Sequence, residues 1–173
     1  MHVAVADEVG LRDRLIQSWG SLGSQWGINR TMAQIHALLL IAPEALSTDE
    51  IMAQLQVSRG NVNMNLRELM NWQLVRKEVK TGERMEFFVA EKDMWKVFRL
   101  IFKERKKREL DPMMEVIHEL KGLKGDHKNK EFAAFSEVME DLDGLTNKGE
   151  KMMELIIKSD ENWFVNTFIK LMR

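Results

Sequence analysis

Apolar side chains recur at helical spacing through most of the chain, and the most informative stretch begins at residue 47. Ile51, Met52 and Leu55 place apolar side chains on one face of a short helix. Ser47 and Glu50 stand three residues apart at the start of that stretch, which is the spacing of a capping box. In a capping box each side chain accepts a hydrogen bond from the other residue's backbone N–H, so the pattern predicts that a helix starts there.

A second short helix is predicted from Arg59 to about Asn71, with Ser58 as its N-cap residue. Its inner face would carry four apolar side chains: Val62, Leu66, Leu69 and Met70. The dipeptide Gln56-Val57 joins the two helices as a tight turn. Two helices joined in this way form a helix-turn-helix, whose second helix can lie in the major groove of DNA. We call the segment from Arg59 to Asn71 the reading helix.

A β-hairpin is predicted directly after the reading helix. Residues 74–79 and 85–89 read as strands that flank the glycine-containing loop Lys80-Thr81-Gly82-Glu83-Arg84. A helix-turn-helix followed by such a hairpin is a winged helix. The hairpin is basic, which suits a wing that follows phosphates or enters the minor groove, and its cations are Arg76, Lys77, Lys80 and Arg84. The alternative is an edge strand that these charges guard against aggregation.

Further helices are expected on both sides of the winged helix. Residues 3–19 and 30–42 are helical in pattern, and Pro43 ends the second of these helices. The pattern after residue 19 is broken by three glycines: Gly20, Gly23 and Gly27. Asp93 can cap a long helix, and two or three helices fill residues 129–173. Interruptions of the C-terminal helices are expected at Asp111-Pro112 (a cap followed by a kink or restart), at Gly122 and Gly125, near Gly144, and near Ser159-Asp160.

This order predicts a mainly α fold with a small β-hairpin, in which a winged helix-turn-helix is embedded in a helical dimerisation body. We expect residues 1–28 to form an N-terminal dimerisation helix and residues 29–92 to form the DNA-binding domain. Residues 93–173 would form a C-terminal helical dimerisation region.

The net charge of −1 hides an uneven distribution of charge along the chain. Residues 58–108 hold 14 lysines and arginines against 7 aspartates and glutamates, whereas the rest of the chain holds 12 against 20. A basic segment beside an acidic body favours one surface that meets phosphate. The alternative is that exposed helices simply carry charge.

Several other classes of protein are disfavoured by the sequence. The absence of cysteine excludes disulfides, thiolate nucleophiles and thiolate zinc sites. No signal peptide is evident, and no apolar run approaches the roughly 20 residues of a membrane helix, so we expect a cytoplasmic protein. Glu115 and His118 have the spacing of one metal-binding pair, but a di-iron bundle needs two such pairs. His36 lies on an apolar helix and is expected in the core. We therefore predict no enzyme activity, no metal and no cofactor.

The outward side of the reading helix carries the candidate chemistry. At 100° per residue, the side opposite the apolar face presents Gly60, Asn61, Met64, Arg67 and Asn71, with Asn63 to one side. Asparagine can form paired hydrogen bonds with adenine edges, and arginine can do so with guanine edges. Because asparagine has a low helix propensity, its repeated use in one short helix favours a polar function for these side chains. A merely tolerated polar surface is the alternative. The predicted DNA-contacting residues are Ser58, Arg59, Gly60, Asn61, Asn63, Met64, Arg67, Lys80, Thr81 and Arg84.

The chain resembles MarR-type winged-helix regulators, and among them the choline-responsive (GbsR-like) repressor branch. The resemblance covers about residues 15–110. Its most similar stretches are Trp26–Thr31 with Ile35–Leu40, the stretch Ser58–Leu69 that covers most of the reading helix, and Gly82-Glu83-Arg84 followed by Phe87-Phe88. One departure is Gln73, because such helices often end in glycine, which accepts a left-handed backbone.

The resemblance implies a homodimeric repressor of double-stranded DNA with a palindromic operator. Apolar side chains near both ends of the chain independently favour a dimer that buries them: Val9, Leu15, Ile16, Trp19, Trp163, Phe164, Phe168, Ile169 and Leu171. The alternative is that the two ends pack against each other within one chain.

A small-molecule effector is a further expectation. Trp19, Trp26, Trp95 and Trp163 can form an aromatic box for a quaternary ammonium compound, although tryptophans in a helical protein more often belong to the core. A different reading of the whole chain is a winged-helix protein-protein interaction module that does not bind DNA.

Overall fold

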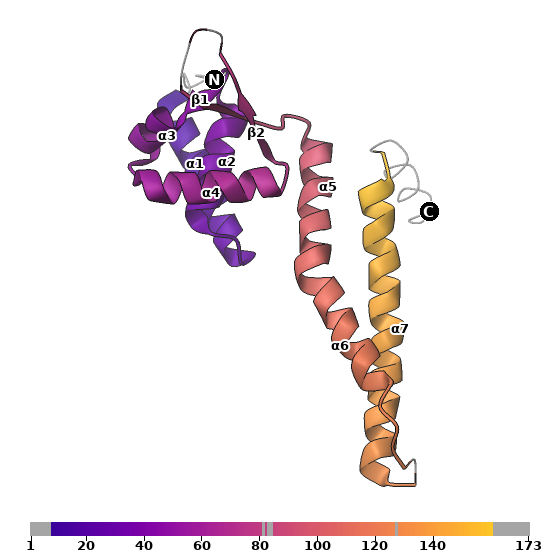
Figure 1. Cartoon of the computed structure of the whole chain (residues 1–173). Coiled ribbons are helices and arrows are strands. Elements are labelled where there is room, and N and C mark those ends of the chain that lie inside the picture. The colour runs from indigo at the N-terminus through magenta and orange to yellow at the C-terminus, as the bar shows by residue number, and fades with distance from the viewer. Residues whose placement is uncertain (1–7, 81, 83–84, 127, 161–173) are drawn as a thin grey trace, which may run out of the picture. The chain divides into compact units, whose positions relative to one another are not determined.

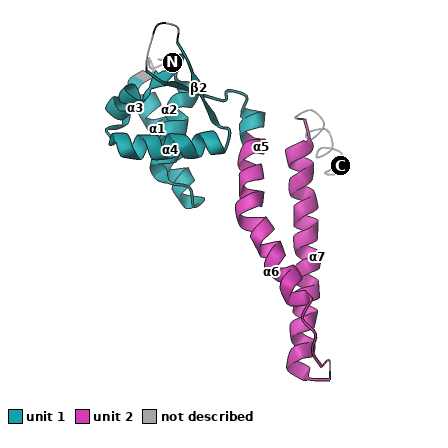
Figure 2. Cartoon of the chain, viewed as in Figure 1, with its two compact units in different colours: residues 1–97 teal, residues 98–173 magenta. Residues whose placement is uncertain are grey.

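The structure is a computed structural model that describes residues 8–80, 82, 85–126 and 128–160. The chain divides into two compact units, Met1–Val97 and Phe98–Arg173, which Figure 2 shows in separate colours. The first unit contains α1 (Glu8–Gln25), α2 (Arg30–Ile41), β1 (Leu46–Ser47), α3 (Thr48–Leu55), α4 (Arg59–Asn71), β2 (Val75–Glu78) and β3 (Phe87–Ala90) (Figure 1).

In its described residues, the second unit is formed by helices and the loop that joins α6 to α7. Helix α5 (Met94–Arg105) begins in the first unit and ends in the second, which continues with the π-helical segment η1 (Lys106–Leu110), α6 (Asp111–Lys121) and α7 (Lys130–Lys158). The predicted class, a mainly α fold with a winged helix-turn-helix and a small hairpin, is confirmed.

Helix α1 is longer than predicted because Gly20 and Gly23 do not interrupt it. Both glycines face α2. A Cβ atom on Gly20 would lie 2.7 Å from Gln34 Cγ, and one on Gly23 would lie 2.6 Å from Ala33 Cβ. The two glycines therefore allow close packing of α1 on α2, and the expected break at these positions is wrong.

The core of the first unit is centred on α2. Ile35, Leu38 and Leu39 on this helix are at most 1% exposed, and α2 contacts α1, α3, α4 and β3. Lys92 binds the C-terminal end of α2: its Nζ donates to the carbonyl oxygens of Leu39, Leu40 and Ala42 at 2.7, 2.6 and 2.9 Å. A cation at a helix C-terminus bonds carbonyls that have no partner within the helix, so Lys92 stabilises the end of α2.

His36 is buried in this core, as predicted, with its ring centroid 6.3 Å from that of Trp19. Burial lowers the pKa of His36 from 6.5 to about 4. No described residue forms a hydrogen bond with its Nε2. The imidazole is therefore neutral at pH 7.

We predict that His36 makes the first unit less stable in mild acid. Between pH 6.5 and 4 the unfolded chain binds a proton that the folded chain excludes, so stability falls as the pH drops through this range, by about 2 kcal/mol between pH 7 and pH 5. Urea unfolding at both pH values would measure the loss. His36→Leu should remove most of this difference, and an unchanged pH dependence in that variant would contradict the assignment.

The helix-turn-helix has the predicted bounds and caps. Ser47 Oγ accepts from the Glu50 N–H, while the Glu50 carboxylate accepts from the Ser47 N–H at 2.7 Å, which completes the capping box. The turn places Gln56 in the left-handed region at φ +54°. Ser58 then caps α4 by accepting from the Asn61 N–H.

The sheet has three antiparallel strands in the order β1-β3-β2, rather than the predicted two. The additional strand, β1, pairs Leu46 with Phe88 and Ser47 with Phe87. A two-residue strand is too short to show alternation, which explains why the sequence pattern missed it. The pair β2 and β3 forms the predicted wing.

The end of α4 explains the departure at Gln73. This residue has φ +61°, in the left-handed region, and its N–H donates to the Met70 carbonyl at 2.9 Å. The helix thus ends in the conformation that glycine favours, although a glutamine occupies the position. Met70 is only partly buried, so the fourth member of the predicted inner face contributes less than the other three.

The expected restart at Asp111-Pro112 is present, because α6 begins at Asp111 with Pro112 in its first turn, but no gap separates α6 from the helix before it. The chain stays helical through η1, and the Asp111 N–H donates to the Lys106 carbonyl five residues earlier. A proline clashes with the carbonyl four residues before it, and a π-helical turn widens the helix next to that position. Asp111 does not cap the helix with its side chain, which instead accepts from Lys106 Nζ at 2.7 Å.

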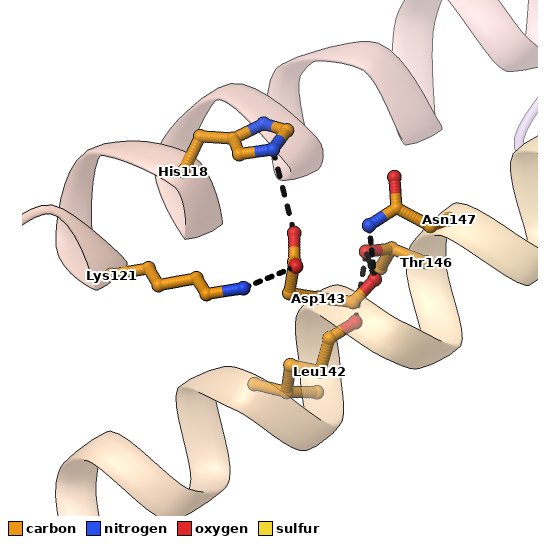
Figure 3. Close-up of polar contacts among 6 residues, drawn as sticks. All are labelled: His118, Lys121, Leu142, Asp143, Thr146 and Asn147. Carbon is orange, nitrogen blue, oxygen red and sulfur yellow. Dashed lines mark hydrogen bonds and ion pairs between the residues drawn. The ribbon is translucent and has the colours of Figure 1, made fainter.

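Helix α7 runs unbroken through Gly144, so the expected interruption there is wrong, whereas the end at Ser159 is as predicted. Figure 3 shows Asp143 of α7 facing α6, with Lys121 Nζ at 2.6 Å from Oδ2 and His118 Nε2 at 3.4 Å from Oδ1. The Lys121 ammonium holds the pKa of Asp143 below its usual range. A glycine inside a helix costs about 1 kcal/mol relative to alanine, and α7 nevertheless contains both Gly144 and Gly149 without a break.

No helix in the described part of the chain combines the length and the apolar character needed to cross a membrane. Several residues of the expected dimer surface, including Trp163 and Phe164, lie outside the described residues. Of the expected residues on α1, Val9 and Leu15 are exposed, whereas Ile16 is buried within the first unit.

Candidate nucleic-acid interface

The reading helix α4 has the predicted orientation. Its inner residues Val62, Leu66 and Leu69 are at most 1% exposed and pack toward α2 and α3. On the outer side, Gly60, Met64 and Arg67 are exposed, and Met64 is 58% accessible. A helix fixed on one side and open on the other can present its outer side chains to a groove of DNA.

Three asparagines of α4 occupy different environments. Asn61 and Asn63 are partly exposed, whereas Asn65 is 3% exposed. Asn65 Nδ2 donates to the Asn61 carbonyl oxygen at 2.8 Å and to Asn61 Oδ1 at 2.6 Å. At helical spacing Asn65 falls at the flank of the apolar face of α4, and spacing alone does not indicate its contact with Asn61.

A shallow cavity lies where α3, α4 and the wing meet. It has a volume of about 240 Å³ and is lined by Ser47, Thr48, Asp49, Arg59, Asn63, Met85 and Glu86. Arg59 forms an ion pair with Asp49 at its edge, and both side chains are more than half exposed. This pair joins the first turns of α3 and α4, so Arg59, one of the predicted DNA-contacting residues, has a carboxylate partner within the chain.

Two of the predicted cations of the wing, Lys77 and Lys80, have partners in the first unit. Lys80 Nζ lies 4.2 Å from the centroid of the Phe87 ring and 4.0 Å from Glu44 Oε2. Lys77 Nζ bonds Glu86 Oε1 across the strands at 2.6 Å. Thr81 and Arg84, which were also predicted to contact DNA, lie outside the described residues.

The electrostatics of this surface are mixed. The Ser47 N–H and hydroxyl hold the pKa of Glu50 below its usual range, and nearby Lys80 acts in the same direction. Glu50 therefore stays ionised, and together with Asp49 and Glu86 it offsets part of the positive charge. Arg67 on the outer side of α4 is exposed and suited to contact with DNA.

The tryptophans expected to hold a ligand have different surroundings. Trp19 is partly buried next to His36, Trp95 is partly buried on α5, and Trp26 is 61% exposed just after α1. Trp163 lies outside the described residues.

The chain is similar to a protein of named function. It is 29% identical over 108 residues to the HTH-type transcriptional repressor GbsR of Bacillus subtilis (strain 168), a match that covers 62% of this chain. The matched region spans 59% of the length of that relative. No family model matches the chain.

Solved structures show a likeness in fold. A structure titled as the crystal structure of a transcriptional regulator has a TM-score of 0.56 and 15% identity, and the match covers 80% of this chain and 94% of that chain. The crystal structure of S. aureus MepR in DNA-binding conformation has a TM-score of 0.40 and 16% identity, and the match covers 76% of this chain and 93% of that chain. The predicted resemblance to MarR-type winged-helix regulators is confirmed.

Proposed function

We propose that the chain is a sequence-specific double-stranded DNA-binding transcriptional regulator that represses its target genes. One observation carries the proposal: α4 is capped by Ser58 and held by a buried inner face, and it leaves Gly60, Met64 and Arg67 exposed on the other side. The similarity to a protein named as a repressor supports the direction of regulation. A regulator of this kind acts beside the chromosome, so the expected cytoplasmic location belongs to the same proposal.

The proposal divides the contacts into two kinds. Asn61, Asn63 and Arg67 would read base edges in the major groove, and Met64 offers an apolar contact for a thymine methyl group. The backbone of DNA would be held by the start of α4 and by the wing, through Ser58, Arg59, Lys80, Thr81 and Arg84. Gly60 would allow the backbone of the first helical turn to approach the DNA.

A homodimer is part of the proposal. The helices α1, α6 and α7 expose large apolar side chains that a second subunit would bury, among them Val9, Leu11, Met113, Val116, Val138, Leu145 and Met152. Residues 1–28 and 93–173 would supply the dimer contacts, and residues 29–92 would bind DNA. Two-fold symmetry would place two reading helices roughly 34 Å apart, which suits a palindromic operator.

A quaternary ammonium effector is proposed from the tryptophans Trp19, Trp26 and Trp95, because aromatic faces attract such cations. Titrating choline while recording tryptophan fluorescence tests the effector. A flat response up to millimolar choline would rule out choline as the ligand.

The function itself is tested by selecting bound duplexes from a random pool and then varying the salt concentration. We expect a palindromic consensus and a log–log salt dependence of binding with a slope of about −3 or steeper, because each neutralised phosphate releases counterions. A protein-interaction module would bind no duplex in a salt-dependent way, and such a result would contradict the proposal.

We predict that Gly60→Ala stabilises the fold and weakens DNA binding. A Cβ atom on Gly60 would have no described atom within 4 Å, and glycine within a helix costs roughly 0.5–1 kcal/mol relative to alanine. Packing within the described part of the chain therefore does not explain why glycine rather than alanine occupies position 60. Thermal unfolding and duplex binding would measure the two effects. Gly144→Ala, at another open helical position, should raise stability and leave duplex affinity unchanged.

Asp49→Asn should strengthen binding to all duplexes by about 2- to 5-fold, because an exposed ion pair is worth up to about 1 kcal/mol and the freed Arg59 can bind phosphate. The salt dependence of binding should also become steeper. The control is Asp141→Asn, which makes the same change of charge at an exposed position on α7. Weaker binding by Asp49→Asn would show that Asp49 orients Arg59 toward DNA instead of holding it away.

A further inference from the structure

Asn65 is an amide on the buried side of the reading helix. Its side chain is 3% exposed, and it lies one helical turn after Asn61 and next to Leu66 in the sequence. A buried polar side chain is unfavourable unless it forms hydrogen bonds. The amino group of Asn65 meets this need through Asn61, whose carbonyl oxygen and Oδ1 both accept from Nδ2.

The backbone bond alone does not require asparagine. Elsewhere in the chain, shorter hydroxyl side chains bond the carbonyl four residues earlier: Ser24 bonds Gly20 at 3.1 Å, Ser136 bonds Phe132 at 2.9 Å and Thr146 bonds Leu142 at 2.8 Å. Asn65 differs from these residues because its Nδ2 also donates to the side chain one turn earlier, at 2.6 Å from Asn61 Oδ1.

The contact fixes the part of Asn61 that a base would meet. An asparagine that pairs with adenine donates from Nδ2 to N7 and accepts at Oδ1 from the N6 amino group. A carbonyl oxygen has two lone pairs, so Oδ1 can accept from Asn65 and from adenine together. The Asn65 donor also determines which end of the Asn61 amide is oxygen and which is nitrogen. Asn61 therefore has a set orientation before DNA arrives.

We propose that Asn65 is a positioning residue that holds the Asn61 side chain in the orientation that reads an adenine. The inference rests on the proposed function, since it assumes that α4 enters the major groove. Asn65 would touch no DNA itself, and it would affect base preference at the one base pair that Asn61 contacts.

The test uses the full chain and a duplex recovered by the wild type from a random pool, together with duplexes that each change one base pair. Asn61→Ala identifies the base pair at which preference is lost. Asn65→Ser should keep the backbone hydrogen bond but cannot reach Asn61 Oδ1. We expect Asn65→Ser to lower the preference at that same base pair by about 5-fold or more, with unchanged preference elsewhere and an unchanged salt dependence.

A double-mutant comparison separates positioning from a purely structural role. In the Asn61→Ala background, Asn65→Ser should change base preference no further, because the side chain that it positions is gone. Asn65→Ala serves as the second variant, and thermal unfolding shows that each protein is folded at the assay temperature. Wild-type preference in the folded Asn65→Ser protein would overturn the inference, as would an equal loss of affinity at every base pair.

The experiments distinguish a failure of the proposed function from a failure of the role proposed for Asn65. If the wild type binds no duplex in a salt-dependent manner, the proposed function is overturned and the role of Asn65 falls with it. If the wild type discriminates among duplexes and Asn65→Ser discriminates equally well, only the role of Asn65 is overturned.

Discussion

Leu66→Ala should destabilise the first unit by about 2–5 kcal/mol, the loss expected when a fully buried leucine is truncated. Leu66 is 1% exposed and belongs to the face that packs α4 against α2. Truncation removes apolar contacts and leaves a cavity that neighbouring helices fill only in part. Urea unfolding followed by circular dichroism would show the loss as an earlier transition for the first unit.

Met64→Ala is the matched control for that experiment. It shortens a side chain of similar size on the same helix, but Met64 is 58% exposed, so we expect a change within about 0.5 kcal/mol. Equal destabilisation by the two substitutions would mean that the outer side of α4 is packed against something in solution, and α4 would then be unavailable to DNA.

Arg67→Ala should reduce affinity for the selected duplex by about 5- to 150-fold, which corresponds to the 1–3 kcal/mol of a good bidentate contact with guanine. Arg67 follows Leu66 in the sequence but is exposed. We expect a far smaller loss on an unrelated duplex, because sequence-independent binding depends on phosphate contacts. Measuring both affinities at one salt concentration gives the change in preference.

Arg67→Lys refines this prediction. Lysine keeps the positive charge but lacks the planar, forked set of donors, so base preference should still fall while binding to unrelated duplexes is kept. A uniform loss on all duplexes in Arg67→Ala, fully restored in Arg67→Lys, would place Arg67 at the phosphate backbone instead of a base.

The helix-turn-helix was predictable because its signals are local. Ser47, Glu50 and Ser58 lie within one turn of the backbone groups that they cap, and α4 has the bounds that its apolar spacing indicated. The glycines were misread for the opposite reason. Gly20 and Gly23 serve contacts with a different helix, and no pattern within α1 reveals that a neighbour lies so close.

The sequence predicted which residues of α4 face inward and which face outward, but not the contacts that they form. Helical spacing separated the outer residues of α4 from the inner ones, as the burial of Val62 and exposure of Met64 show. The ion pair of Arg59 with Asp49 joins two helices across a turn, and its geometry depends on how those helices cross. The strand β1 was missed because two residues carry too little periodicity.

Ser47 connects two parts of the first unit that sequence reading treats separately. It lies opposite Phe87 as the last residue of β1, and it is also the residue that caps α3. Ser47 therefore joins the register of β1 against β3 to the capped start of α3. The wing is thus held in fixed register beside the first helix of the helix-turn-helix, so we expect weaker binding to operators in which the major-groove and flanking contacts are spaced differently.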